Sequence, residues 1–259
     1  GLRLIGELAE YAKKQKREEC DVSELVVGLK CGGSDGFSGL TANPLIGRFS
    51  DKLISKGGST VLTEVPEMFG AETILMNRCV NEEVFDKTVS LINDFKDYFT
   101  SHNQVVYENP SPGNKKGGIT TLEDKSLGCV QKSGSADVED VIEIGGSVTR
   151  KGLNLLTGPG NDTVAVTNLT ASGCHLILFS TGRGTPVGAP VPTVKIATNT
   201  NLAKRKPHWI DFNAGEIISG ADLTDELFEY VIEVANGKQT NNEKNGYKEI
   251  SIFKDGVVL

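Results

Sequence analysis

The sequence predicts an α/β protein with a mostly parallel sheet and helices on both faces of that sheet. Two patterns lead to this prediction. Short and continuously apolar segments, such as LVVGLK at 25–30 and HLILFS at 175–180, are typical of strands that are buried on both faces. Segments with apolar residues at helical spacing alternate with these strands along the chain. The chain has 259 residues, of which 38% are hydrophobic, so it can bury a substantial core, and we expect residues 1–259 to form one domain.

In the first half of the chain, helical periodicity is clearest in residues 82–100, where Val84, Leu91 and Phe95 share one face. A second helix is expected to begin with Asn43 as its N-cap, because Pro44 suits the first helical position, and to end at the glycine pair 57–58. Similar arguments predict helices at 2–17, 67–78 and 119–132, strands at 25–30 and 59–64, and a loop at 109–118.

In the second half, four short apolar segments are interpreted as strands. They lie at 153–158, 175–180, 193–198 and 208–212, with a helix at 161–173 between the first two. A further helix is expected at 222–234, where Leu223, Leu227 and Val231 share one face. The segment KEISIFKD at 248–255 is interpreted as one more strand, whereas the acidic, turn-rich segment 137–150 predicts no single element.

Composition excludes several classes of function. The formal net charge of −7 argues against nucleic-acid binding, which needs a basic face. The sequence contains no apolar stretch of about 18 residues, so no membrane-spanning helix is expected. The five cysteines form an odd set without a C-x-x-C pair, which argues against a disulfide framework or a structural zinc site. A reducing cytoplasm is therefore the expected location.

Polar residues follow the predicted strands at six places. These strand ends lead into CGGSDG (31–36), Glu64, PGND (159–162), STGRGTPVG (180–188), Asn199 and DFNAG (211–215). Since the ligand site of an open parallel sheet lies outside the carboxyl ends of its strands, we expect these groups to share one polar crevice. The glycines allow tight turns and a close approach of a ligand to the backbone.

Several residues at these strand ends carry chemistry. Cys31 is interpreted as a nucleophile, a thiolate metal ligand or a buried small hydrophobe, and the same alternatives hold for Cys174. Glu64 can supply a metal ligand or a general base. Arg183 and the surrounding glycines can hold a carboxylate, or Arg183 can form a structural ion pair. A crevice of this kind suits a divalent metal that handles an oxygen-rich acid. The sequence contains no P-loop motif.

Five long motifs together resemble the altronate dehydratase and galactarate dehydratase family. They are CGGSDGFSGLTANP, TEVPEMFGAE, NPSPGNKKGGITTLEDKSLG, FSTGRGTPVG and WIDFNAG, and the similarity extends over nearly the whole chain. The C-terminal segment NNEKNGYKEISIFKDGVVL is most similar to the altronate dehydratase members. Proteins of this family are longer and carry a small β-rich N-terminal domain. The resemblance therefore implies that this chain is the C-terminal catalytic region of a longer enzyme.

The resemblance also implies an activity. The expected reaction is the removal of water from D-altronate to give 2-dehydro-3-deoxy-D-gluconate, a hydro-lyase step of hexuronate catabolism. It implies a Rossmann-like sheet and a divalent metal, Fe²⁺ with Mn²⁺ as the alternative. Galactarate dehydratase and sulfolactate sulfo-lyase activity are the alternatives within the lyases. A sugar-acid-binding domain that is inactive without the N-terminal region, a nucleotide-binding module and a homodimer also remain open.

Chemical reasoning then assigns roles to residues. Lys195 is the first candidate for the base that removes the C2 proton, Lys125 is the second, and Glu64 is the third catalytic candidate. The metal is expected on Glu64 with Cys31 or Asp35, and Cys174 is a further candidate ligand. The expected substrate-binding residues are Ser34, Asp35, Asn43, Asn114, Thr181, Arg183, Thr185 and Asn199.

Overall fold

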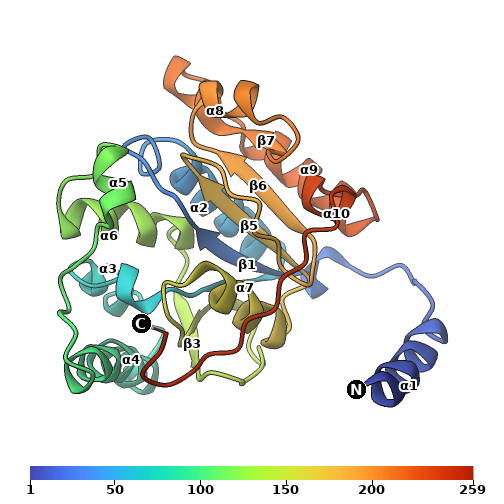
Figure 1. Cartoon of the computed structure of the whole chain (residues 1–259), viewed down its shortest axis with the longest axis horizontal. Coiled ribbons are helices and arrows are strands. Elements are labelled where there is room, and N and C mark those ends of the chain that lie inside the picture. Colours follow the sequence, from blue (N-terminus) through green and yellow to red (C-terminus); the bar gives the residue numbers. More distant parts are fainter. Residues whose placement is uncertain (259) are drawn as a thin grey trace.

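The computed structural model describes residues 1–258 and contains a seven-stranded parallel sheet (Figure 1). The order of the strands is β3-β4-β2-β1-β5-β6-β7, and every neighbouring pair is parallel. This architecture confirms the predicted α/β class. The strands are β1 Val26–Cys31, β2 Ser59–Leu62, β3 Val138–Ile142, β4 Gly152–Leu156, β5 Leu176–Thr181, β6 Thr193–Ala197 and β7 Phe212–Asn213.

Helices cover both faces of the sheet because alternate strand residues point in opposite directions. Val27 and Leu29 of β1 pack with Phe49 of α2 in one core, whereas Phe179 of β5 packs with Leu169 of α7 in a second core. Helix α1 has no buried residue and lies away from the sheet (Figure 1). The helices are α1 Leu2–Lys13, α2 Ala42–Ser55, α3 Glu72–Met76, α4 Glu82–Ser101, α5 Pro112–Lys116, α6 Leu122–Val130, α7 Asp162–Ala171, α8 Thr200–Arg205, α9 Thr224–Ala235 and α10 Asn241–Lys244. Within residues 1–258, none of the helices has the length and apolar character needed to cross a bilayer.

The strand order reverses direction at one place in the sheet. From β1 the chain moves to β2, then to β3 at one edge of the sheet and back to β4 between β3 and β2. It then crosses to β5 on the other side of β1. The carboxyl ends of β1 and β5 therefore form the topological switch point, where ligands bind in sheets of this kind. The loops that leave these two strands contain CGG (31–33) and GRG (182–184), so the geometry places two of the predicted polar segments beside each other.

Several predicted elements differ from the structure. The strand predicted at 248–255 is wrong: this segment runs across α7, where the Ser251 N–H donates to Thr167, and Ile250 and Ile252 are exposed. The strand predicted at 208–212 is reduced to β7, and the helix at 67–78 begins only at Glu72. The predicted loop 109–118 contains α5, because Ser111 and Asn114 form a capping box around Pro112. Strand β3 occupies part of the unassigned segment 137–150.

Candidate functional site

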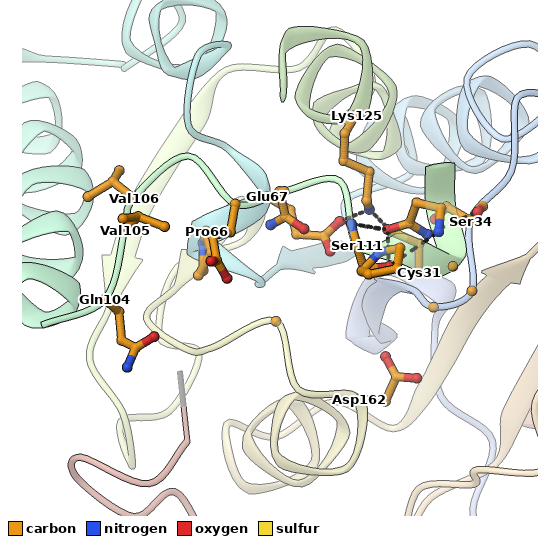
Figure 2. A pocket seen from close by; sticks show the side chains of 18 of the residues that line it. Cys31, Ser34, Pro66, Glu67, Gln104, Val105, Val106, Ser111, Lys125 and Asp162 are labelled. Atoms are coloured by element: carbon orange, nitrogen blue, oxygen red, sulfur yellow. Dashed lines mark hydrogen bonds and ion pairs between the residues drawn. The ribbon is translucent and has the colours of Figure 1, made fainter. Parts of the chain in front are cut away.

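A cavity of about 560 Å³ opens at the carboxyl ends of β1 and β5. Figure 2 shows Cys31, Ser34, Glu67 and Lys125 close together on one side of the cavity, where Lys125 descends from α6 toward Glu67 and Cys31. Val105 and Val106 lie on the opposite side, on the segment that follows α4. The polar side is lined by Cys31, Gly32, Gly33, Ser34, Glu67, Ser111, Asn114, Lys125, Asp162 and Arg183.

A network of buried charges lies directly beneath the cavity. The carboxylate of Glu64 is fully buried and accepts hydrogen bonds from the ammonium groups of Lys30 and Lys132, and from the Cys31 N–H at 2.9 Å. Lys30 also donates to Asp162 at the first position of α7, at 2.9 Å. Charges without access to water are tolerated only when they are paired in this way. Glu64 has a φ of 71°, an uncommon conformation for a residue with a Cβ, and these three hydrogen bonds hold it there.

Two thiols extend the network toward the cavity. The Sγ of Cys31 accepts from Lys132 at 2.9 Å and lies 3.5 Å from the Sγ of Cys129. The hydrogen bond with Cys129, followed by the ammonium groups of Lys125 and Lys132, lowers the pKa of Cys31 well below its usual value. Burial raises the pKa of Cys129 well above its usual value. We therefore assign the thiolate to Cys31 and the protonated thiol to Cys129, whose Sγ also lies 2.7 Å from a carboxylate oxygen of Glu67.

The donor atoms of Cys31, Glu67 and Cys129 all lie within 4.8 Å of one another. Two sulfurs and one carboxylate oxygen are a donor set that suits Fe²⁺ or Zn²⁺ better than Mn²⁺, which prefers oxygen ligands. Lys125 Nζ lies 3.0 Å from Cys129 Sγ, 3.7 Å from Cys31 Sγ and in contact with Glu67, so these donors already converge on a positive charge. These three residues, which we call the donor triad, fit a divalent cation.

The loops around the cavity are held by close contacts that require glycine. A Cβ at Gly32 would lie 2.6 Å from the Asp162 carboxylate, and a Cβ at Gly182 would overlap Asp35. Asp35 in turn accepts from Thr198 at 2.8 Å and from Asn199 at 3.0 Å, which ties the loop after β1 to the end of β6. These contacts fix the positions of the Cys31 and Arg183 loops relative to each other.

The structure brings about half of the predicted site residues to the cavity. Cys31, Ser34, Asn114, Lys125 and Arg183 line it, and Glu64 lies just beneath it. Ser34 Oγ is buried without a hydrogen-bond partner among the described residues, which leaves it available to a ligand.

The other predicted residues have structural contacts. Asp35 and Asn43 line a neighbouring cavity of about 370 Å³, which shares Ser34 and Lys125 with the first. The remaining three are engaged within the loops: Thr181 accepts from the Gly184 N–H, Thr185 from the Val187 N–H, and Asn199 from the Leu202 N–H.

Two predicted residues lie away from the cavity. Cys174 comes just before β5, at the opposite end of the sheet from Cys31, and burial raises its pKa to about 12. Lys195 of β6 is fully buried on the α7 face, with its Nζ 3.5 Å from the centre of the Phe179 ring and no hydrogen-bond partner among the described residues. Neither residue lines the two cavities described above.

Lys195 gives a testable pH dependence. Burial lowers its pKa from the usual 10.5 to about 7, so between these values the unfolded chain binds a proton that the folded protein does not. Stability therefore rises with pH over this window, by about 1.4 kcal/mol per pH unit. A Lys195→Met variant is expected to be more stable than the parent at pH 7, and this gain should shrink by about 2 kcal/mol at pH 9. Urea denaturation at pH 7 and pH 9 measures this gain in the free energy of unfolding. A gain that is equal at both pH values would contradict the lowered pKa of Lys195.

Sequence reasoning missed three residues of the network, Lys30, Cys129 and Lys132. It placed Asp162 in the crevice, within PGND (159–162), but assigned it no role. One signal was available, because Lys30 interrupts an apolar strand that is buried on both faces and so demands buried acidic partners. Cys129 lies four residues after Lys125 on α6, which places both on the same face of that helix. Nothing local to Lys132 indicates that it pairs with Glu64.

A family described as "D-galactarate/Altronate dehydratase, C-terminal" matches residues 22–258. Altronate dehydratase of Bacillus subtilis (strain 168) is 63% identical over 264 residues, which cover 100% of this chain and 53% of that protein. Altronate dehydratase of Escherichia coli (strain K12) is 58% identical over 262 residues, with the same shares covered. Galactarate dehydratase (L-threo-forming) of Escherichia coli (strain K12) is 40% identical over 252 residues, 95% of this chain and 48% of that protein. The chain thus spans about half the length of these relatives.

Proposed function

The chain belongs to the D-galactarate/altronate dehydratase family, and from this premise we propose that it is the catalytic region of a hydro-lyase that dehydrates a sugar acid. The proposed reaction converts D-altronate to 2-dehydro-3-deoxy-D-gluconate and water. The free thiols of the donor triad suit the reducing cytoplasm that the cysteine pattern predicts. The proposed enzyme includes a further region, because the named dehydratases are about twice as long as this chain.

One observation carries this proposal: a cavity at the switch point combines an arginine, hydroxyl and amide groups, and a buried network of ammonium groups and carboxylates. The C2 proton of a sugar acid is weakly acidic, because its removal adds a second negative charge beside the carboxylate. Fixed positive groups in a site that excludes water stabilise such a charge far better than water does.

The first role belongs to Arg183. Its guanidinium lines the cavity and donates to the Gly113 carbonyl at 3.1 Å, which positions it above the N-terminus of α5. We assign it to the substrate carboxylate, with Ser34 and Asn114 near the hydroxyl groups. A bound divalent cation, held by Cys31, Glu67 and Cys129, would stabilise the same developing charge as a Lewis acid.

An Arg183→Ala variant tests this role. Loss of the guanidinium is expected to raise KM by about 10- to 100-fold, because a charge-assisted contact to the substrate carboxylate disappears. Steady-state kinetics of the longer enzyme measures this, with Arg205→Ala on α8 as the matched control of equal charge change. An unchanged KM in Arg183→Ala would mean that another group binds the substrate carboxylate.

We propose Asp162 as the base in place of Lys195. Its carboxylate lines the cavity, keeps about a third of its side chain accessible and is oriented by Lys30 at 2.9 Å. Lys125 stays protonated, so we assign it as the group that can supply a proton to the departing C3 hydroxyl. Although burial acts against it, Cys129, Cys31 and Glu67 raise the pKa of Lys125 well above its usual value, which makes it a poor base.

The base assignment predicts contrasting kinetics for two variants of the longer enzyme. Asp162→Asn is expected to lower kcat by about 100-fold or more, since a positioned general base contributes at least that factor. Lys195→Met is expected to keep kcat within a few-fold, because Lys195 lies away from the cavity. A large loss of kcat in Lys195→Met, with kcat nearly unchanged in Asp162→Asn, would instead identify Lys195 as the base.

The proposed function is tested by assaying this chain alone and joined to the preceding half of the Bacillus subtilis relative. Both are incubated without oxygen with Fe²⁺ and D-altronate, galactarate or sulfolactate, and the 2-keto acid product is measured. We expect D-altronate to be turned over fastest by the joined protein. Binding of D-altronate without turnover by either protein would favour the binding-domain alternative, and neither binding nor turnover of any acid would refute the proposal.

A further inference from the structure

The ammonium group of Lys125 lies where the donors of the triad converge. Its Nζ is 3.0 Å from Cys129 Sγ and 3.7 Å from Cys31 Sγ, and it contacts the Glu67 carboxylate. The same three donor atoms lie within 4.8 Å of one another, which is the arrangement that could hold a metal ion. The same position can therefore hold either of two cations, the ammonium group of Lys125 or a divalent metal ion.

We propose that the Lys125 ammonium and a divalent cation compete for the donor triad, so that binding of the cation drives Lys125 out into the adjoining cavities. This inference rests on the proposed function in one respect, namely the role that the bound divalent ion has in the dehydration. The competition itself concerns Lys125, Cys31, Glu67 and Cys129, and it applies to any divalent ion that accepts sulfur and oxygen ligands.

Charge makes the two occupants mutually exclusive. A divalent ion bound to the triad would lie within a few ångströms of the ammonium group if Lys125 kept its position, and like charges this close repel strongly in a buried site. Lys132 already donates to Cys31 from the other side at 2.9 Å and is anchored on Glu64 at 2.9 Å. Of the two ammonium groups near Cys31, that of Lys132 is therefore fixed by Glu64, whereas that of Lys125 depends on the triad.

The structure offers a place for the displaced ammonium. Lys125 lines both the cavity of about 560 Å³ and the neighbouring cavity of about 370 Å³. Ser34 lines both as well, and its buried Oγ has no partner among the described residues, so it can accept a hydrogen bond from the moved group. The flexible four-carbon stem of lysine makes such a change of direction possible without movement of α6.

The exchange has a consequence for the reaction. Without the divalent ion, the Lys125 ammonium neutralises the triad and is withheld from the cavity. With the ion bound, the ammonium lies in the cavity beside the substrate, where it can protonate the leaving hydroxyl. Binding of the divalent ion and movement of the Lys125 ammonium into the cavity then occur together. A site without its divalent ion would therefore lack the group that protonates the leaving hydroxyl.

Cobalt binding tests the competition. Co²⁺ bound to thiolate gives a strong near-ultraviolet absorption, so its affinity is measured by titration of the reduced protein without oxygen. Lys125→Met is expected to tighten Co²⁺ binding by about 10- to 100-fold, the factor that corresponds to one lost charge-assisted hydrogen bond in the competing state. Lys116→Met, at an exposed position of α5, is the matched control. Equal or weaker binding in Lys125→Met would overturn the inference.

A second measurement uses the unaltered protein, in case Lys125→Met does not fold. Reductive methylation followed by peptide mass spectrometry reports how accessible each lysine amine is. Lys125 is expected to react several-fold faster with saturating Zn²⁺ than without it, whereas the fully buried Lys132 stays protected in both states. Equal labelling of Lys125 in both states, or failure of both ions to bind, would overturn the inference. Neither measurement uses a substrate, so an exchange of cations without turnover of any sugar acid would refute the proposed function alone.

Discussion

A Cys31→Ser variant of the longer enzyme is expected to lose about 1,000-fold in kcat. Cys31 supplies the thiolate of the donor triad, and its sulfur also accepts from Lys132 at 2.9 Å. A serine hydroxyl does not ionise at neutral pH, so the cation and the ammonium groups of Lys125 and Lys132 each lose one anionic partner. The rate is measured with D-altronate and Fe²⁺ under reducing conditions, and bound iron is measured in the same samples.

Two other cysteines provide controls of the same chemical change. Cys174→Ser replaces a thiol that is buried at the opposite end of the sheet, and Cys20→Ser replaces an exposed one. Both variants are expected to keep the iron content and kcat of the parent within a few-fold. Loss of iron in Cys174→Ser with retention in Cys31→Ser would show that the cation binds elsewhere than at the triad.

A Lys132→Met variant is expected to be less stable than the parent by about 3–5 kcal/mol. Removing one partner of a buried ion pair leaves the other charge without compensation, and a penalty of this size is typical. Lys132 is fully buried, and its ammonium serves both Glu64 and Cys31 at 2.9 Å. The free energy of unfolding is measured by urea denaturation at neutral pH in the presence of reductant and without added metal.

The matched control is Lys151→Met, which removes an ammonium from an exposed ion pair. Lys151 lies 2.8 Å from Glu24, and more than half of each side chain is accessible. Exposed pairs contribute little, so this variant should differ from the parent by less than about 1 kcal/mol. Equal losses in the two variants would mean that the network beneath the cavity is not held together by its charges.

Much of the fold could be predicted because burial on both faces makes the strands continuously apolar. Strands β1, β2, β4, β5 and β6 confirm this prediction, and α4 confirms the helical periodicity of residues 82–100. The prediction of a strand at 248–255 failed because the alternation of apolar and polar residues there also suits an extended chain that lies on α7. There, Phe253 contacts Tyr98 of α4, while Ile250 and Ile252 face solvent.

The site was only partly predictable for a different reason. Strand ends mark where a crevice lies, so Cys31, Arg183 and Glu64 could be placed there from the sequence. Strand register decides which side chains face that crevice. Lys195 is paired with Phe179 in the sheet and points into the α7 core instead. Cys129 lies near the end of α6 and Lys132 in the 3-10 turn that follows, about 100 residues after Cys31, and such long-range contacts leave no local pattern.

Anomalous scattering from a crystal soaked with Co²⁺ under reducing conditions tests the central claim most directly. The donor triad predicts one strong peak between Cys31, Glu67 and Cys129, with the Lys125 side chain turned away from it. A peak at Asp35 or Cys174, or no peak within ligand distance of Cys31, would contradict the proposed centre and with it the proposed mechanism.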